Sequence, residues 1–304
     1  MDWTTSLEKN FIDEQEGNHL AKISAVNVKK EFKVRNDSGK KSSLVVLDDF
    51  NLEIKEGEFI SILGPSGCGK STFLSILAGL ASKSSGNLTV DGQEVNGINQ
   101  KHSVVFQGYA LFPWRTVLEN VETGLEIRGI KKKERKEIAL EYINLVGLQA
   151  FANRYPHELS GGMKQRVAIA RSLAYNPDVL LMDEPFGALD AQTREVLQTE
   201  LLRIWESSNK TIIFITHSID EAVYLSDRVA VMTARPGKVK EIIDIPLARP
   251  RSFDIRNSRE FVKFRQQAWD VLKDEVQHAQ EQDIPQSETV NKLVKGKVLN
   301  EKVV

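Results

Sequence analysis

The stretch Leu159-Ser160-Gly161-Gly162-Met163-Lys164-Gln165-Arg166 decides the fold, because it opens a predicted helix between two motifs that bear chemistry. Apolar residues recur with a helical period over 161–175, and Ser160 is a residue type that caps helices well. Gly161 and Gly162 leave the first backbone N–H groups of that helix accessible, so its N-terminus can attract an anion. In isolation an ordinary helix start is the better interpretation, and the flanking motifs change it.

Upstream, the nine residues Gly64-Pro65-Ser66-Gly67-Cys68-Gly69-Lys70-Ser71-Thr72 match the pattern GxxxxGK[ST]. A short apolar strand is expected before them at 58–63 and a helix after them at 70–80, the context that a phosphate-binding loop requires. Glycines let backbone N–H groups face a β-phosphate, and the helix N-terminus adds positive potential. We predict that all nine residues bind nucleotide, with Lys70 on the β- and γ-phosphates and Ser71 as a Mg²⁺ ligand. Cys68 is interpreted as filler at a variable position rather than as a redox switch.

Downstream, Val179-Leu180-Leu181-Met182-Asp183-Glu184 is an apolar strand that ends in two carboxylates. A buried carboxylate is costly unless it meets a cation. We therefore expect Asp183 to hold Mg²⁺ through water, and Glu184 to polarise the attacking water as a general base. A plain acidic strand end is the alternative, which the phosphate loop makes the weaker interpretation.

Two further polar residues follow apolar strands and are candidates for the same site. His217 comes after the strand expected at 211–215, where a lone histidine is more often structural than catalytic. Beside a γ-phosphate it can donate to the phosphate and orient Glu184 with its water. Gln107 ends the strand expected at 102–106, where it can contact Mg²⁺ or water, or serve only as a polar strand end.

Bulk properties narrow the class of protein. The chain has 304 residues, 41% hydrophobic and 27% charged, with a formal net charge of −1, so its overall charge does not indicate nucleic-acid binding. No apolar run approaches the roughly 20 residues of a membrane-spanning helix, and the acidic N-terminus lacks the features of a secretion signal. The single cysteine fits a reducing compartment. We expect a cytoplasmic protein that reaches a membrane only through partners.

Strands and helices alternate along the chain, which predicts an α/β fold with a largely parallel sheet. Two antiparallel strands at 22–34 and 44–55, joined by a polar loop at 35–43, are expected to form a side sheet. A hairpin is expected at 86–95. The mostly helical segment 108–175 reads as an inserted subdomain. Further helices are expected at 116–129, 131–147 and 191–207, and strands at 228–233 and 238–245.

The domain boundaries follow from the same pattern. We predict a flexible lead-in at 1–21, one domain at 22–250 and a C-terminal extension at 251–304. Within the extension an amphipathic helix is expected at 257–280, followed by a disordered tail. Its apolar residues are expected to pack against the domain or its twin; they are Phe261, Phe264, Trp269, Leu272 and Val276.

Together these motifs resemble the ATP-binding subunit of ABC transporters over roughly residues 22–250. The resemblance implies a phosphate-loop NTPase core with a mainly parallel sheet, an antiparallel β side sheet and an α-helical subdomain. It assigns Gln107 to the Q-loop, Leu159 to Gln165 to the signature, Ala188-Leu189-Asp190 to the D-loop and His217 to the switch histidine. It also implies that Phe32 stacks on adenine, with core packing as the alternative.

The resemblance further implies that two such domains face each other head to tail. ATP on Lys70 of one copy would then meet Ser160, Gly161, Gly162 and Asp190 of the other, a second copy or a paralogue. Closure would bury two nucleotides and hydrolysis would reopen the pair, which drives a transmembrane permease. A solute-binding protein outside the cytoplasm would be an indirect partner, and the site of action would be the cytoplasmic face of the cell membrane.

Finer features resemble the nitrate/sulfonate/taurine/bicarbonate importer subfamily. Pro113-Trp114 and Ala234-Arg235-Pro236-Gly237 are the most telling, and Phe186 and Met163 agree with them. By the same resemblance, the apolar stretch of Tyr109, Leu111, Phe112 and Trp114 receives a helix of the permease, with packing inside the helical subdomain as the alternative, chiefly for Leu111 and Phe112. The transported solute is expected to be a small anion such as nitrate, sulfonate/taurine or bicarbonate, with a thiamine precursor as another possibility. A soluble ABC ATPase outside transport, or an exporter subunit, remains the alternative class.

Overall fold

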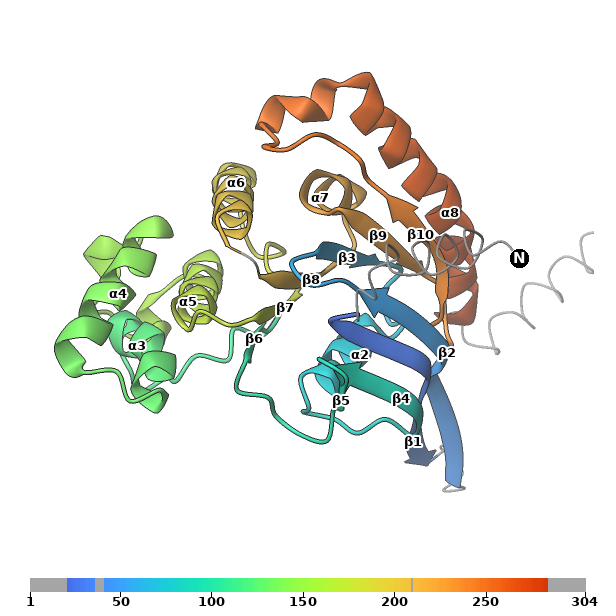
Figure 1. Ribbon diagram of the computed structural model, residues 1–304, viewed down its shortest axis with the longest axis horizontal. Helices are drawn as coiled ribbons and strands as arrows, with labels where there is room; N and C mark the ends of the chain where they lie inside the picture. Colours follow the sequence, from blue (N-terminus) through green and yellow to red (C-terminus); the bar gives the residue numbers. More distant parts are fainter. Residues whose placement is uncertain (1–20, 36–40, 209, 284–304) are drawn as a thin grey trace, which may run out of the picture.

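The computed structural model describes residues 21–35, 41–208 and 210–283. The predicted lead-in, the middle of the predicted 35–43 loop and the predicted tail therefore lie outside the described residues. Two sheets organise the described part of the chain, one with six strands and one with four (Figure 1). The α/β fold predicted from the sequence, with its antiparallel side sheet, is confirmed.

The six-stranded sheet has the order β10-β9-β3-β8-β7-β6. It is parallel apart from β10, which pairs antiparallel with β9 at one edge. Its central strands are continuous apolar runs because helices cover both of their faces. The strands are β3 (Phe59–Leu63), β6 (His102–Val105), β7 (Val179–Asp183), β8 (Thr211–Thr216), β9 (Arg228–Met232) and β10 (Val239–Asp244).

The four-stranded antiparallel sheet has the order β2-β1-β4-β5 and lies over α2 (Lys70–Leu77) in Figure 1. Phe50 of β2 and Phe73 of α2 are fully buried, with their ring centroids 4.3 Å apart. This contact fixes the helix that follows the phosphate loop between the two sheets. The strands are β1 (Ile23–Arg35), β2 (Lys41–Ile54), β4 (Ser85–Val90) and β5 (Gln93–Glu94).

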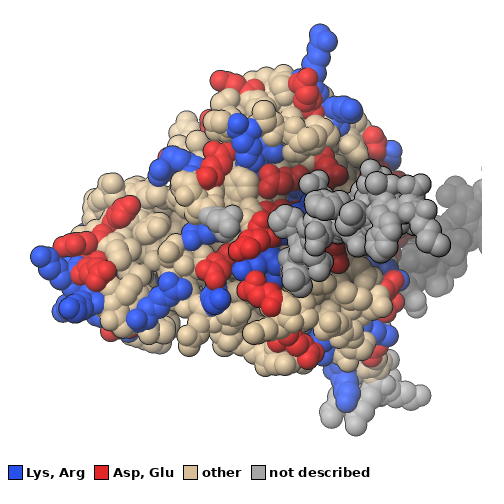
Figure 2. All heavy atoms as spheres, in the orientation of Figure 1, with Lys and Arg blue, Asp and Glu red and all other residues tan. Residues whose placement is uncertain are grey.

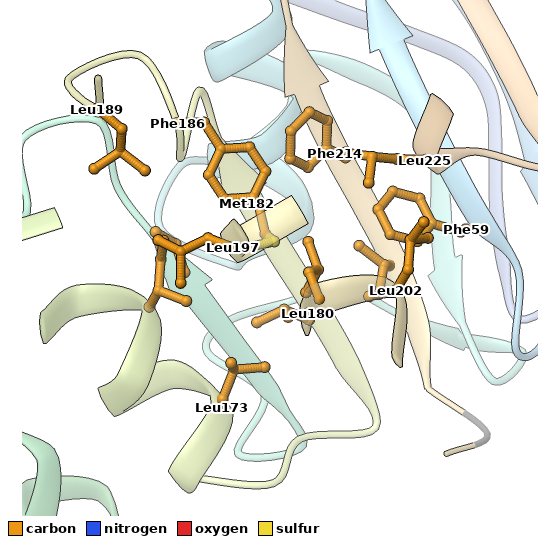
Figure 3. Packing of buried hydrophobic residues seen from close by; sticks show 14 of the residues in the cluster. Phe59, Leu173, Leu180, Met182, Phe186, Leu189, Leu197, Leu202, Phe214 and Leu225 are labelled. Carbon is orange, nitrogen blue, oxygen red and sulfur yellow. The ribbon is translucent and has the colours of Figure 1, made fainter. Parts of the chain in front are cut away.

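The remaining helices cover the other face and one end of the six-stranded sheet. Helices α3 (Val117–Ile127), α4 (Lys132–Leu145) and α5 (Gly161–Ala174) lie together as a group, where the sequence predicts a helical subdomain (Figure 1). Helix α6 (Ala191–Glu206) lies beside this group. Helix α7 (Ile219–Leu225), which was not predicted, lies beyond α6 and packs against α8 and β3 (Figure 1). The shared apolar core runs from Phe59 to Phe186 and Phe214 (Figure 3).

After β10 a 3-10 turn at Phe253–Asn257 leads into α8 (Arg259–Asp283), which packs on α7, β9 and β10. Phe261, Ala268 and Leu272 form its buried stripe. The expectation that Trp269 lies on the apolar face is wrong, because its side chain is 46% exposed. Successive residues of a helix are turned by about 100°, so a core-facing Ala268 turns Trp269 outward.

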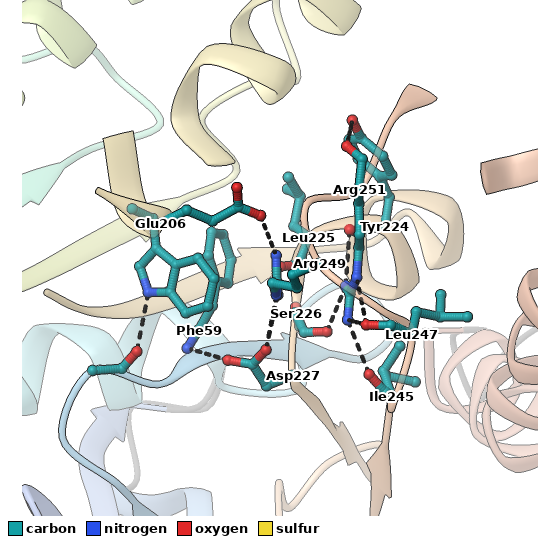
Figure 4. Close-up of polar contacts among 12 residues, drawn as sticks. Phe59, Glu206, Tyr224, Leu225, Ser226, Asp227, Ile245, Leu247, Arg249 and Arg251 are labelled. Atoms are coloured by element: carbon teal, nitrogen blue, oxygen red, sulfur yellow. Dashed lines mark hydrogen bonds and ion pairs between the residues drawn. The ribbon is translucent and has the colours of Figure 1, made fainter. Parts of the chain in front are cut away.

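Two arginines secure the connection between β10 and α8 (Figure 4). The guanidinium of Arg249 pairs with Asp227 at 2.9 Å and stacks on Trp205. Arg251 is buried, and burial lowers its pKa to about 10, still far above neutrality. Its guanidinium donates to backbone carbonyls of Val223, Tyr224, Ser226, Ile245 and Leu247.

The surface carries charges of both signs. On the face that Figure 2 shows, acidic and basic side chains of the described residues are interspersed, unlike the one-sided basic surface typical of nucleic-acid binding. In the described ranges no helix combines the length and the apolar character that crossing a membrane requires.

Candidate functional site

The phosphate loop connects β3 to α2 and depends on glycine conformation at two positions. Gly67 and Gly69 have φ angles of 72° and 107°, a left-handed region that residues with a Cβ rarely adopt. A Cβ on Gly69 would also lie 2.8 Å from the side chain of Leu47. Gly69 is the N-cap of α2 and provides no side-chain hydrogen bond, so the first N–H groups of the helix face the loop without a side-chain acceptor.

Lys70 lies at the start of α2 with only 5% of its surface exposed. Its Nζ donates to the carbonyl oxygens of Gly64 and Pro65, at 2.8 and 2.9 Å. Both acceptors are neutral, and an anionic phosphate oxygen is a stronger acceptor for an ammonium group. The lysine is thus held over the loop, where a phosphate can replace the carbonyl groups.

Ser71 and Asp183 come together from two elements. The Oγ of Ser71 donates to Oδ1 of Asp183 at 3.0 Å, which places a hydroxyl and a carboxylate side by side. Burial raises the pKa of Asp183, and the neighbouring charge of Glu184 adds to this effect while Ser71 opposes it. A bound cation would offset the burial cost of the ionised form.

These two oxygen donors suit Mg²⁺, which takes one or two protein ligands and completes its shell with phosphate oxygens and water. Among the residues that the structure describes, no cluster of three or more histidine, cysteine, aspartate or glutamate side chains could hold a metal on its own. Ser71 and Asp183 therefore fit an ion that arrives with a nucleotide, rather than a resident metal centre.

Glu184 lies between two polar side chains from neighbouring strand ends. Its Oε2 is 3.3 Å from Nε2 of Gln107 and 3.3 Å from Nδ1 of His217. The residue has φ of 47°, an unusual value for glutamate, which turns the chain sharply after β7. Gln107, Glu184 and His217 follow β6, β7 and β8, and carboxyl ends of parallel strands meet at one edge of a sheet.

One cleft of about 760 Å³ unites most of these groups. Nine of the residues predicted from the sequence line it: Ser66, Gly67, Gly69, Lys70, Ser71, Thr72, Gln107, Glu184 and His217. A carboxylate held by an amide and an imidazole thus faces a cationic phosphate loop. This arrangement can bind a polyphosphate and activate a water molecule beside it.

Three lining residues were not predicted as site residues: Leu44, Val46 and Arg235. Leu44 and Val46 are alternate residues of β2, so they face the same side, a signal that the strand pattern carries. Arg235 belongs to the turn Ala234-Arg235-Pro236-Gly237, which the sequence indicates only as a feature shared with the importer subfamily. Its approach to the cleft depends on packing between distant segments.

Other predicted residues lie outside the lining. Gly64 and Pro65 contribute the carbonyl partners of Lys70, and Cys68 is buried beneath the loop. Phe32 is 42% exposed on β1, which excludes core packing. It lies directly opposite Leu44 in the strand register, hence on the same sheet face as a cleft residue.

The signature residues start α5, away from α2. Ser160 caps the helix, and its Oγ accepts from the N–H of Met163 at 3.3 Å. A Cβ on Gly162 would lie 3.3 Å from the carbonyl oxygen of Ala188. Asp190 caps α6 by accepting from the N–H of Thr193 at 2.9 Å. Within the described chain, Ser160, Gly161, Gly162 and Asp190 do not line the cleft that contains Lys70.

Comparisons with known proteins show the family of the chain. The ABC transporter family model matches residues 47–187. An uncharacterized ABC transporter ATP-binding protein of Methanocaldococcus jannaschii is 52% identical over 270 residues, covering 89% of this chain and 98% of that protein. The nitrate import ATP-binding protein NrtD of Synechocystis is 47% identical, covering 77% of this chain and 91% of that protein.

Two more similarities concern a sulfonate importer and a solved dimer. The aliphatic sulfonates import ATP-binding protein SsuB of Bacillus cereus is 48% identical, covering 72% of this chain and 85% of that protein. A dimeric ATP-binding cassette in a post-hydrolysis state, bound to ADP and phosphate, aligns with a TM-score of 0.66 and 36% identity. That alignment covers 74% of this chain and all of the cassette.

Proposed function

The chain belongs to the ABC transporter family of ATP-binding proteins and is an ATPase, and on this premise we propose that it energises the import of a small anion. The observation that carries the catalytic part is the contact of Glu184 Oε2 with both Gln107 and His217 at the wall of the phosphate-loop cleft. The similarity to a nitrate and a sulfonate import protein supports the choice of solute.

We propose that the phosphates of ATP bind to the loop and to Lys70, whose ammonium exchanges its carbonyl acceptors for phosphate oxygens. Ser71 and Asp183 would hold Mg²⁺, which supplies charge neutralisation at the phosphates when bound. Glu184 accepts a proton from the attacking water as general base. His217 and Gln107 keep the Glu184 carboxylate oriented toward the cleft, and His217 also donates to the γ-phosphate.

The working unit in this proposal is a head-to-tail pair with a second copy or a paralogue. Ser160 and Gly162 present a helix N-terminus that this chain leaves outside its own cleft. Such a terminus attracts an anion through backbone N–H groups and the helix dipole. The ATP of a partner would meet Ser160, Gly161, Gly162 and Asp190, and the dimeric state of the similar cassette supports this arrangement.

A transmembrane permease is the proposed partner on the outside of the helical group. Trp114 is 70% exposed, and its ring centroid lies 5.6 Å from that of Phe112. Phe112 lines a second cleft, of about 390 Å³, with β6 and the segments around Ala78 and Ile98 on one side and α3 and α5 on the other. Its exposed apolar residues include Ile98 and Ile127, and exposed apolar surface of this kind marks a binding face. The site of action would be the cytoplasmic face of the membrane.

The identity of the solute rests on the relatives, because the described cleft is suited to a nucleotide. Nitrate, a sulfonate such as taurine, or bicarbonate is the proposed cargo, delivered by an extracytoplasmic solute-binding protein. A thiamine precursor is the second candidate within import. A soluble ABC ATPase outside transport would not require the apolar cleft beside Phe112, which favours the transporter.

Purification of the tagged protein from native membranes tests the proposal. We expect a permease to co-purify, and vesicles containing the complex to take up one of the proposed anions with ATP. Trp114→Ala is expected to reduce co-purification about tenfold or more, since a buried aromatic anchor contributes 2 kcal/mol or more to an interface. Trp269→Ala, which alters an exposed tryptophan on α8, is the matched control. Recovery with ribosomes or DNA in place of a permease would contradict the proposal.

A further inference from the structure

We infer that Arg235 contacts the phosphates of the bound nucleotide and that the C-terminal helix α8 positions it there. This inference deepens the proposed function and rests on it, because it concerns the same cleft. Both Arg235 and α8 lie outside residues 47–187, which the family model matches. The inference therefore gives the C-terminal extension a role at the nucleotide site.

The turn between β9 and β10 is docked directly on the phosphate loop. The N–H of Gly237 donates to the carbonyl oxygen of Val46 at 2.9 Å, which ties the turn to β2. A Cβ on Gly237 would lie 2.1 Å from the carbonyl oxygen of Cys68, so the backbones of turn and loop touch. Thr233 closes the turn by accepting from the N–H of Lys238 at 3.0 Å. A shift of the turn would therefore displace the phosphate loop.

Arg235 extends from this turn into the cleft. Its Nε donates to the carbonyl oxygen of Gly67 at 3.0 Å, and the residue lines the cleft together with Lys70. A Cβ on Gly67 would lie 2.3 Å from a terminal nitrogen of Arg235, so the guanidinium lies close against a glycine of the phosphate loop. A guanidinium stays charged at all relevant pH values and matches phosphate oxygens in pairs.

Helix α8 holds the backbone on which Arg235 is mounted. The Nε2 of Gln282 donates to the carbonyl oxygen of Arg235 at 2.9 Å. The N–H of Ala234 donates to Oε2 of Glu275 at 2.8 Å, and Lys240 pairs with Oε1 of the same carboxylate at 2.7 Å. Glu275 is only 7% exposed, so these partners compensate a buried charge. Two consecutive residues of the turn are thus fixed by one helix.

The anchoring of α8 makes it a rigid support for the turn. Its stripe of Phe261, Ala268 and Leu272 is buried on the same body that carries β9 and β10. Glu275 follows Leu272 by three residues, and Gln282 follows Glu275 by seven. Residues at these spacings lie on the same side of a helix. Gln282 and Glu275 are positioning residues, and Arg235 is the residue that meets the ligand.

The first test compares ATP, ADP and AMP binding to the full-length protein by calorimetry. Arg235→Ala is expected to weaken ATP and ADP about tenfold or more, the effect of a lost charge-assisted hydrogen bond, and AMP less than about twofold. Arg235→Lys should restore part of the loss, because the charge returns. Wild-type affinity of Arg235→Ala for ATP, or an equal loss for all three nucleotides, would overturn the phosphate contact.

A comparison with Lys70→Ala separates this inference from the proposed function. Wild-type protein that fails to bind ATP, or Lys70→Ala that binds ATP normally, would defeat the proposed function itself. If the wild type binds ATP and Lys70→Ala binds it weakly, unchanged binding by Arg235→Ala would defeat the inference alone.

The second test addresses α8 and uses Gln282→Ala, an exposed substitution that leaves the core intact, together with Glu275→Gln. Each is expected to weaken ATP binding severalfold, with little effect on AMP. Gln282→Ala loses one neutral hydrogen bond, and Glu275→Gln loses the charge that pairs with Lys240 and accepts from Ala234. Neither should add to the loss in an Arg235→Ala background, because the residues act through Arg235. Gln277→Ala is the control, since its amide bonds to Glu281 of the same helix rather than to the turn. Unchanged affinity of Gln282→Ala, or additive losses, would overturn the positioning role.

Discussion

Helices α2 and α5 both begin at glycine-rich motifs that predict an anion-binding N-terminus, but their surroundings differ in the structure. Helix α2 follows Gly69, which offers no side-chain cap, and its first turn lines a cleft shared with Glu184 and His217. Helix α5 follows Ser160, which caps its own helix, and its first turn lies outside that cleft. A helix N-terminus is thus surrounded by reactive side chains at α2 and is exposed at α5.

A helix N-terminus therefore becomes an active site only through the side chains that the fold places around it. Around α2 the chain supplies the ammonium of Lys70, the hydroxyl of Ser71 on the carboxylate of Asp183, and the carboxylate of Glu184 beside Gln107. Beside α5, a Cβ on Gly161 would meet the hydroxyl of Tyr109, and a Cβ on Gly162 would meet the carbonyl oxygen of Ala188. The proposed head-to-tail pair resolves this asymmetry, because the second copy would bring its own α2 cleft to the exposed start of α5.

The substitution with the largest expected effect tests whether the start of α2 in one copy meets the start of α5 in another copy when ATP is bound. Glu184→Gln removes the proposed base and keeps the side chain's size, so ATP turnover should fall by a factor of at least about 100. Bound ATP would then persist, and the variant should elute as a dimer in ATP. Steady-state hydrolysis and size-exclusion chromatography measure the two effects. Glu141→Gln, an exposed substitution on α4, is the control; a strictly monomeric, ATP-bound Glu184→Gln would break the comparison.

The next effect concerns the α2 start alone. Lys70→Ala removes the ammonium that the loop carbonyls hold, and charged hydrogen bonds contribute about 1.5–3 kcal/mol. The affinity for ATP should therefore drop by roughly tenfold to a hundredfold, as measured by calorimetry. Lys133→Ala, an exposed lysine on α4, should bind ATP like the wild type. Unchanged binding by Lys70→Ala would move the phosphate site away from α2.

Local motifs made most of the site around the start of α2 predictable from the sequence. The loop at Gly64 to Thr72 and the polar strand ends at Gln107, Glu184 and His217 were predicted because short spacings and apolar strands fix their local geometry. Parallel strand order then brings the strand ends together at one edge of the sheet. Whether all of them act as predicted is what the substitutions decide.

Long-range packing limited the remaining predictions. Arg235 reaches Gly67 across 168 residues, and no local pattern specifies that approach. Trp269 was placed on the wrong face of α8 because its neighbour Ala268 is small yet occupies the buried position. The short helix α7 was missed because its seven residues span barely two helical turns.

A smaller effect separates the α5 start from nucleotide binding. Ser160→Ala removes the cap of α5, so the free energy of unfolding should fall by about 1 kcal/mol. ATP-driven dimerisation in a Glu184→Gln background should weaken, while ATP affinity of the single chain stays within about twofold. Thr116→Ala, which removes the comparable cap of α3, should lose stability without losing dimerisation. If Ser160→Ala dimerises normally, the start of α5 does not contact the partner's nucleotide.

The smallest expected effect concerns Cys68 and sharpens the claim that the α2 start works through its backbone and Lys70. The thiol is 1% exposed, and burial raises its pKa, so less reactive thiolate is present at neutral pH. Native protein should therefore react slowly with a thiol reagent, whereas protein unfolded in guanidinium should react fast. Cys68→Ala should bind ATP within about twofold of the wild type, because removing the thiol leaves the donating N–H groups in place. Rapid labelling of the native protein with loss of ATP binding would show that this side chain does control the phosphate loop. That result would add the Cys68 side chain to the backbone and Lys70 as a group on which the start of α2 depends.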